Sequence, residues 1–370
     1  MNIRPHELSL SHLALVMGLD MPRLVSIAED VGSHYLPAEI KLVKGKERLI
    51  EVPVAWFKAA LGRLHGQLQF VFRPHPIVHG GVRGRSCFTA ASKHLGRRFV
   101  IQRDIQDCYP SVTTDMMYRA LLRWRVQEPT ATVLSKLLTV RGHIAQGSPV
   151  SGLALNILLN EFDQRIASFC GSVGASVIRT YDDIVVSLNK AAVVPIVEAR
   201  LDREIAAVGL RVNERKRRRK GLQRHTSAQV VHGLIVNSRR GVRIPPVVAA
   251  RVVRWAEELQ RGAQSACLET LPMLLDKRRR LLGFANHFAQ ASFGPASLIK
   301  SLIAQSDAWI ERRLKAKGHL WRGRRWDSIA ARPDAMHVAA TILARVPVAP
   351  RESLGAASEP PFDPTSHAPR

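Results

Sequence analysis

Residues 177–186 read Val177-Ile178-Arg179-Thr180-Tyr181-Asp182-Asp183-Ile184-Val185-Val186. An apolar run enters this stretch, two adjacent carboxylates follow, and a second apolar run leaves it. The pattern predicts a β-hairpin with the acids at its turn. Two carboxylates held on a hairpin suit Mg²⁺ bound against phosphates, because Mg²⁺ takes few protein oxygens and leaves room for substrate. Adjacent acids also occur in ordinary solvated turns, so the hairpin alone does not decide the function.

A second acidic segment lies upstream and could supply the partner that the hairpin needs. It reads Val100-Ile101-Gln102-Arg103-Asp104-Ile105-Gln106-Asp107. Two-metal phosphoryl transfer requires carboxylates from separate strands that converge on one point. The two segments together predict a metal site made by Asp104, Asp182 and Asp183, with the alternative that Asp104 only caps a turn. Asp107 is equally compatible with a surface role.

The charge of the chain indicates a polyanionic partner. Its 370 residues carry 55 Lys and Arg against 30 Asp and Glu, a formal net charge of +25. Such an excess favours nucleic acid. A membrane surface is the alternative, but no apolar stretch approaches the roughly 20 residues of a spanning helix. Four cysteines without a CxxC pair are typical of reduced thiols, and the N-terminus lacks a signal-peptide core. We therefore expect a cytoplasmic protein that does not associate with membranes.

Periodicity and turn residues divide the chain into a mixed part and an all-helical part. Helices are predicted over 5–33 (several short ones), 54–72, 89–95, 115–126, 150–168 and 191–208. Strands are predicted over 39–53 (two), 98–105, 228–236 and 241–244, in addition to the acidic hairpin. The all-helical part follows, with helices over 246–261, 268–290 and 295–314. The composition after residue 326 is rich in Pro, Ala and Ser and predicts a flexible tail.

Seven motifs follow one another in chain order. They are Arg48-Leu49-Ile50-Glu51-Val52-Pro53, Gly84-Arg85-Ser86, Asp104-Ile105-Gln106-Asp107-Cys108-Tyr109-Pro110-Ser111-Val112, Gln146-Gly147-Ser148-Pro149-Val150-Ser151, Thr180-Tyr181-Asp182-Asp183, Gly209-Leu210-Arg211-Val212-Asn213-Glu214-Arg215-Lys216 and Val231-His232-Gly233-Leu234. In this order they resemble the motifs of bacterial reverse transcriptases of the retron type, and the match runs from about residue 40 to 290. Three positions depart from the family pattern. Ala90 stands where the family has Asn, Thr180 precedes a tyrosine that comes one place late, and His232 replaces Thr.

The resemblance implies an α+β fold, a right-hand polymerase with fingers, an antiparallel palm sheet with helices, and a helical thumb. The implied domains are an N-terminal helical extension, fingers, palm, thumb and a mostly flexible tail. Their expected bounds are 1–35, 36–100, 101–240, 241–325 and 326–370.

The resemblance also assigns roles at the site. Asp104, Asp182, Asp183 and the carbonyl of Ile105 would hold two Mg²⁺ ions, for which Mn²⁺ can substitute. Tyr109 would be an aromatic gate that leaves no room for a ribose 2′-hydroxyl; the alternative is an ordinary core aromatic.

Further residues are expected to contact the incoming deoxynucleoside triphosphate. Gln146 and Gly147 would shape the surface beneath the template and nucleotide, or else simply form a loop before a helix. Lys46 and Arg48 would hold the triphosphate, with a solvated surface as the alternative. Lys216 would protonate or bind the departing pyrophosphate, or belong to a solvated basic face.

Basic residues and tryptophan are the expected nucleic-acid contacts, through phosphates and through stacking on unpaired bases. Trp321 could instead anchor a helix. The candidates are Arg85, Arg217, Arg218, Arg279, Trp321, Arg322, Arg324 and Arg325.

The function implied is RNA-directed DNA synthesis on a cognate structured non-coding RNA that supplies template and primer. The product would be a short single-stranded DNA joined to RNA (msDNA), serving antiphage defence with an effector protein encoded nearby. One alternative is a defence-associated reverse transcriptase outside the retrons that makes repetitive or untemplated DNA, which the departures at Ala90, Thr180 and His232 favour. The other is an RNA-binding scaffold with a decayed polymerase site, against which the retained acids argue.

Overall fold

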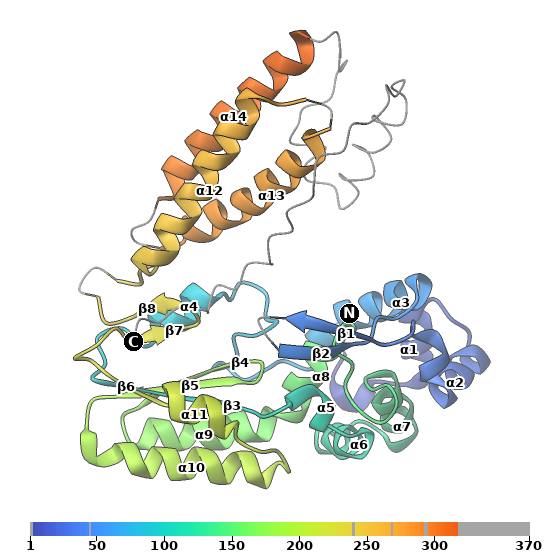
Figure 1. Ribbon diagram of the computed structural model, residues 1–370. Coiled ribbons are helices and arrows are strands. Elements are labelled where there is room, and N and C mark those ends of the chain that lie inside the picture. The colour runs from blue at the N-terminus through green and yellow to red at the C-terminus, as the bar shows by residue number, and fades with distance from the viewer. Residues whose placement is uncertain (1–2, 44–45, 239–240, 268, 292–294, 317–370) are drawn as a thin grey trace. The chain divides into compact units, whose positions relative to one another are not determined.

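The computed structural model describes residues 3–43, 46–238, 241–267, 269–291 and 295–316 (Figure 1). The chain forms two compact units, Met1–His232 and Gly233–Arg370, here called the N-terminal unit and the helical unit. Their boundary falls in the turn between two very short strands, β7 (Val230–Val231) and β8 (Leu234–Ile235). The five domain bounds expected from the sequence stay predictions.

The centre of the N-terminal unit is a four-stranded sheet with the order β4-β5-β3-β6. Its strands are β3 (Phe99–Asp104), β4 (Ser176–Thr180), β5 (Asp183–Leu188) and β6 (Leu222–Arg224). Every neighbouring pair is antiparallel. Helices α9 (Asn160–Ser172) and α10 (Val194–Ala207) cover one face of the sheet (Figure 1). The predicted acidic hairpin is confirmed as β4 and β5, with Tyr181 and Asp182 between them.

Burial explains why β3 and β5 read as nearly continuous apolar runs. Five of the six residues of each strand are buried, as expected of strands covered on both faces. Ile101 and Val186, register partners, are 0% exposed, and burying such a side chain contributes roughly 1.5–3 kcal/mol. This core fixes the register that brings Asp104 opposite Asp183, since a slip of one residue would turn the apolar side chains outward.

Helices and a hairpin make up the rest of the N-terminal unit. They are η1 (Pro5–Glu7), α1 (Leu10–Met17), α2 (Met21–Glu29), η2 (Val31–His34), β1 (Glu39–Val43), β2 (Lys46–Ile50), α3 (Ala55–Val71), α4 (Cys87–Ser92), α5 (Cys108–Ser111), α6 (Thr114–Arg123), α7 (Glu128–Leu137), α8 (Ser151–Leu158), η3 (Ala191–Val193) and α11 (Glu214–Lys220). Side-chain caps begin several of them; at α6, for example, the hydroxyl of Thr113 accepts the N–H of Met116 at 3.2 Å.

The helical unit contains α12 (Pro246–Gln264), α13 (Leu271–Phe288) and α14 (Ala296–Ala316), close to the predicted bounds. Apolar side chains such as Val252, Leu281 and Ile299 are completely buried. Arg278 on α13 is also buried and binds both oxygens of Asp307 on α14, at 2.6 and 2.7 Å. The pair joins the two helices.

One helix prediction was wrong. The expected helix over 150–168 is two helices, because α8 ends at Leu158 and α9 begins at Asn160. In a straight helix, Asn156 and Asp163 would be about 10 Å apart along the axis. The break lets both side chains reach one guanidinium, that of Arg179. The strands predicted over 228–236 and 241–244 are reduced to β7, β8 and a single bridge between Ile235 and Arg243.

Among the helices described, none alone has the length and apolar composition of a membrane span. Helices α1 and α2 meet that test only as a pair bent by 92°, and their apolar residues Leu13, Met17 and Leu24 lie in the core.

Candidate active site

Three carboxylates from two strands meet at one end of the central sheet. Asp104 ends β3, Asp183 begins β5, and the two are register partners; Asp182 precedes Asp183 in the turn. One oxygen from each side chain lies within 4.8 Å of the others. The amide of Ile105 donates to the carbonyl of Asp182 at 3.1 Å, which ties the end of β3 to the turn. The predicted convergence of the acids is therefore present.

Helix α11 completes the site with an amide and an ammonium group. Asn213 caps the helix by accepting the N–H of Lys216 at 3.2 Å, and its Nδ2 donates to Asp104 Oδ2 at 2.9 Å. The Nζ of Lys216 donates to Asp104 Oδ1. Lys216 was a sequence candidate, whereas Asn213 was only quoted as part of a motif. An Asn directly before a predicted helix is typical of an N-cap, and this could have indicated that the Asn213 side chain is held in place.

The electrostatics of the triad reflect three acids in little solvent. Burial, followed by the charges of Asp182 and Asp104, raises the pKa of Asp183 to about 7, although Lys216 opposes this. Burial and Asp104 also raise the pKa of Asp182, against the charges of Lys216 and Arg48. Burial lowers the pKa of the Lys216 ammonium, but its hydrogen bond to Asp104 and the three acidic charges raise it by more.

This donor set fits a divalent cation. Hard oxygen ligands from carboxylates are what Mg²⁺ and similar ions take, and an added positive charge would relieve the mutual repulsion of the acids. Lys216 now supplies part of that charge, so a metal bound at Asp104 Oδ1 would compete with the ammonium.

The turn that carries Asp182 has little space around it. Tyr181 has φ of 54°, in the left-handed region. A Cβ on Gly80 would lie 2.5 Å from the backbone nitrogen of Tyr181, and one on Gly152 would lie 2.7 Å from its ring. Two glycines from separate segments therefore make room for this tyrosine.

Two of the predicted nucleotide-binding residues, Tyr109 and Arg48, lie close enough to the acids to interact with them electrostatically. Tyr109 is half-buried, and its pKa is raised by burial and then by the charge of Asp182, which puts its ring near the turn. Arg48 on β2 is close enough for its charge to lower the pKa of Asp182. Lys46 begins β2, but its side chain lies outside the described part of the chain.

Gln146 and Gly147 pack against the end of β2. The carbonyl of Gln146 accepts the N–H of Glu51 at 2.9 Å. Gly147 has φ of 136°, and a Cβ there would lie 2.7 Å from the carbonyl oxygen of Glu51. Glu51 itself is buried and binds Arg141 and His143 at 2.8 and 2.7 Å. A side chain at position 147 would push these segments apart.

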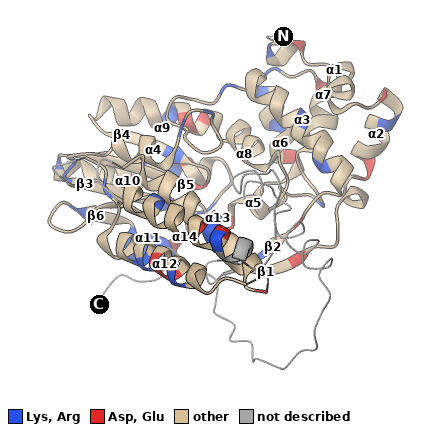
Figure 2. Ribbon diagram, turned by 90° about the horizontal axis from the view of Figure 1, so that it is seen from above, with Lys and Arg blue, Asp and Glu red and all other residues tan. Residues whose placement is uncertain are grey.

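Lys and Arg residues occur along both units (Figure 2). Some of the predicted nucleic-acid contacts already bind other protein groups, and others are exposed. Arg85 binds loop carbonyls, including that of Pro76 at 3.0 Å. Arg217 pairs with Glu214 and Asp202, and Arg279 with Asp276. Arg218 is exposed. The remaining candidates lie outside the described residues: Trp321, Arg322, Arg324 and Arg325.

Two of the three departures from the family pattern are in contact. The Oγ1 of Thr180 and the Nε2 of His232 are hydrogen-bonded at 3.1 Å. Near them His94, four residues after Ala90, binds the hydroxyl of Ser187 at 2.8 Å. Burial, then the charges of His232, Arg97 and His79, lowers the pKa of His94 to about 3. Thr180, His232, His94 and Ser187 thus form a partly buried polar cluster next to the acidic hairpin.

Comparison with known proteins identifies the family. The family described as Reverse transcriptase (RNA-dependent DNA polymerase) matches residues 41–225. Among curated proteins, the retron Mx65 reverse transcriptase of Myxococcus xanthus is 30% identical over 227 residues, covering 56% of this chain and 52% of that protein. The retron Mx162 reverse transcriptase of the same organism is 31% identical over 258 residues, covering 61% and 53%.

Two further similarities are more distant. The retron Ec86 reverse transcriptase of Escherichia coli is 25% identical over 220 residues, covering 59% of this chain and 67% of that protein. Among solved structures, telomerase from Candida albicans in complex with a fragment of telomeric RNA has a TM-score of 0.42 at 12% identity, covering 89% and 70%.

The chain spans about half the length of the two Myxococcus relatives, and the family match covers half of its 370 residues. Its mixed helix-and-sheet structure is the α+β, right-hand polymerase fold expected from the motifs. The curated relatives that it resembles are retron reverse transcriptases, and the chain itself belongs to the reverse transcriptase (RNA-dependent DNA polymerase) family.

Proposed function

We propose that this chain is an RNA-directed DNA polymerase that copies part of a cognate structured RNA into single-stranded DNA. The observation that carries the proposal is the meeting of Asp104, Asp182 and Asp183 beside Lys216, in a chain of the reverse transcriptase family. The residues implied by the motifs as fingers, palm and thumb are 36–100, 101–240 and 241–325.

The acids and the lysine have distinct roles in this proposal. Asp104, Asp182 and Asp183, with the carbonyl of Ile105, hold two Mg²⁺ ions, and Mn²⁺ can replace them. When bound, the metal neutralises charge on the triphosphate and on the attacking 3′-hydroxyl. Lys216, whose ammonium already lies against Asp104, binds the leaving pyrophosphate or gives it a proton. Without metal, the hydrogen bond to Asp104 and the three acidic charges raise the pKa of the Lys216 ammonium.

The neighbouring residues select and orient the substrate. Arg48 and Lys46 bind the triphosphate, and the Tyr109 ring lies under the sugar, where it leaves no room for a 2′-hydroxyl. Gln146 and Gly147 support the templating base pair, and the packing of Gly147 on Glu51 keeps that surface in place. Arg85, Arg217, Arg218 and Arg279 contribute charge to RNA binding.

The partner in this proposal is a structured non-coding RNA that provides template and primer, and the similarity to retron reverse transcriptases supports this choice. The product is a short DNA joined to that RNA, and its use in antiphage defence would involve an effector protein encoded nearby.

The test is to express the chain from its native flanking DNA, purify it, and sequence the bound nucleic acid before and after ribonuclease treatment. An Asp182→Asn/Asp183→Asn variant is the matched control, because it keeps the size of both side chains and removes two charges. We expect one defined RNA joined to a short DNA copy of part of itself, absent in the control.

Two other results would redirect the proposal. Repetitive or template-free DNA would indicate a defence polymerase outside the retrons. RNA without DNA, despite added Mg²⁺ and deoxynucleotides, would indicate a scaffold without polymerase activity.

A further inference from the structure

The turn between β4 and β5 holds an aromatic residue in an unfavourable backbone conformation. Tyr181 has φ of 54°, and the left-handed region is energetically unfavourable for a non-glycine residue. Such a conformation persists only where the surrounding structure enforces it. Asp182 follows directly, so the backbone of Tyr181 determines where that carboxylate points.

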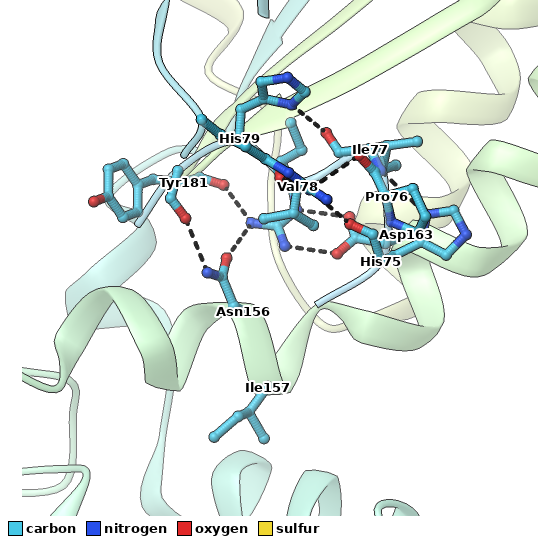
Figure 3. Close-up of polar contacts among 12 residues, drawn as sticks. His75, Pro76, Ile77, Val78, His79, Asn156, Ile157, Asp163 and Tyr181 are labelled. Carbon is cyan, nitrogen blue, oxygen red and sulfur yellow. Dashed lines mark hydrogen bonds and ion pairs between the residues drawn. The ribbon is translucent and has the colours of Figure 1, made fainter. Parts of the chain in front are cut away.

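Arg179, on strand β4 just before the turn, makes a contact that holds Tyr181 in this conformation. Its side chain is 0% exposed, and its Nε and Nη2 each donate to one oxygen of Asp163 at 2.6 Å (Figure 3). The remaining nitrogen, Nη1, donates to the carbonyl of Tyr181 at 2.9 Å and to Asn156 Oδ1 at 3.1 Å. The guanidinium therefore holds the peptide group that leads into Asp182.

Tyr181 is also held through Gly80. The Nδ2 of Asn156 donates to the carbonyl of Gly80 at 3.0 Å, and Gly80 is the residue that packs closely on the Tyr181 backbone. Asn156 thus links the arginine to the glycine segment. The same segment pairs with β4, because the N–H of His79 donates to the carbonyl of Arg179 at 2.7 Å.

The buried Arg179–Asp163 ion pair contributes little net stability, so we expect it to have a further role. A completely buried ion pair is a weak source of stability, since the desolvation of both charges offsets their attraction. Apolar side chains of similar size could fill the space. What they could not supply is a directional hydrogen bond to one carbonyl of the turn.

We propose that Arg179, Asp163 and Asn156 are positioning residues for the acidic turn. Asp163 fixes the guanidinium, and the guanidinium holds the Tyr181 carbonyl so that Asp182 and Asp183 stay where they can share a divalent cation with Asp104. The inference rests on the proposed function and extends it to residues that lie behind the three acids.

The test compares metal binding with stability in Arg179→Met/Asp163→Leu. Replacing both partners by apolar side chains leaves no buried charge unpaired, so we expect an unfolding transition close to that of the wild type. We expect the Mn²⁺ concentration for half-saturation to rise by about 10–100-fold, as is typical when groups supporting metal ligands are lost. Mn²⁺ binding to the full-length chain, freed of nucleic acid, is measured by the electron paramagnetic resonance of the free ion. Binding that persists in Asp182→Asn/Asp183→Asn is subtracted.

A matched control applies the same substitutions to the other bidentate pair. Arg278→Met/Asp307→Leu should leave Mn²⁺ affinity unchanged, because that pair joins α13 to α14. Should the first double variant fail to fold, Arg179→Lys keeps a cation beside Asp163 but lacks the forked geometry to reach the Tyr181 carbonyl as well. It is expected to show the same weakened Mn²⁺ binding, with kcat for nucleotide addition reduced and KM for template unchanged.

The outcomes separate the two proposals. Wild-type Mn²⁺ affinity in either folded Arg179 variant would overturn the positioning role and leave the polymerase proposal intact. A wild-type chain that binds no more Mn²⁺ than the Asp182→Asn/Asp183→Asn control would overturn the metal site and, with it, the positioning role.

Discussion

Two buried arginines, one in each unit, bind an aspartate with nearly identical geometry but in different surroundings. Arg179 and Asp163 are joined by two bonds of 2.6 Å, and Arg278 and Asp307 by bonds of 2.6 and 2.7 Å. Both members of the first pair are 0% exposed, whereas Asp307 is 27% exposed. The first guanidinium also holds a turn carbonyl next to the acidic site. The same interaction thus serves positioning in one unit and helix packing in the other.

The largest difference is expected in stability when only the arginine is removed. Arg179→Met leaves Asp163 buried without its cation, which should lower the free energy of unfolding by about 3–5 kcal/mol. Arg278→Met should lower it less, because Asp307 reaches solvent. Urea unfolding, followed by hydrogen exchange in β4 and in α13, measures both. Equal losses would show that the two pairs do not differ as described.

Nucleotide selectivity should depend on the acidic region alone. Tyr109→Ala is expected to reduce discrimination against ribonucleotides by about 10–200-fold, the range for a steric contact in a pocket. The ratio of kcat/KM for deoxy- and ribonucleotides measures it. Trp309→Ala, an aromatic change on α14 of the helical unit, is the control and should leave the ratio unchanged. Unaltered selectivity in the Tyr109 variant would remove its role as a gate.

Acid should destabilise the N-terminal unit through its buried histidines. Burial lowers the pKa of His232 to about 4, and His94 titrates near 3, both well below the ordinary value of 6.5. Both are therefore neutral in the fold and take up protons on unfolding below pH 6.5. Their contribution is present above pH 6.5 and is lost as the pH falls towards 4, by on the order of 1–2 kcal/mol for each at pH 5.

Replacement of His232 by the family's threonine sharpens that prediction. His232→Thr should reduce the stability lost between pH 7 and pH 5 by on the order of 1–2 kcal/mol, as measured by urea midpoints. An undiminished pH dependence in this variant would assign the acid sensitivity to other groups.

The smallest effect is expected for single surface arginines. Exposed Arg218 is free to release counterions on binding RNA, so Arg218→Gln should reduce the slope of log affinity against log salt by roughly 0.7–0.9. Arg217→Gln should change it less, because Arg217 already pairs with Glu214 and Asp202. Filter binding at several salt concentrations measures both slopes. A larger change for Arg217 would reverse the ranking.

The fold and the acids were predictable because their signals are local. Apolar runs around Asp182 and Asp183 specified a hairpin, and the strand ending at Asp104 supplied its partner. The residues that hold the turn gave weaker signals. Arg179 interrupts an apolar strand, and Asp163 and Asn156 lie on two helices. No local pattern indicates that both side chains contact the Arg179 guanidinium.

Tertiary hydrogen bonds were also beyond pattern reading. The side chain of Arg85, a predicted nucleic-acid contact, donates to carbonyls of the loop that pairs with β4, and its contact with nucleic acid stays a prediction. Thr180 and His232 looked like separate departures from the family pattern, and a hydrogen bond joins them across 52 positions of the chain. Neither contact can be read from the local sequence pattern.

The most direct test of the account is template-dependent DNA synthesis by Asp183→Asn against Asp107→Asn. Asp107 lies in the same region, is exposed and has φ of 42°, a conformation that asparagine tolerates. The account predicts no synthesis by Asp183→Asn, with RNA affinity retained, and wild-type synthesis by Asp107→Asn. Synthesis by Asp183→Asn at the wild-type rate would contradict the claim that the three acids form the polymerase site.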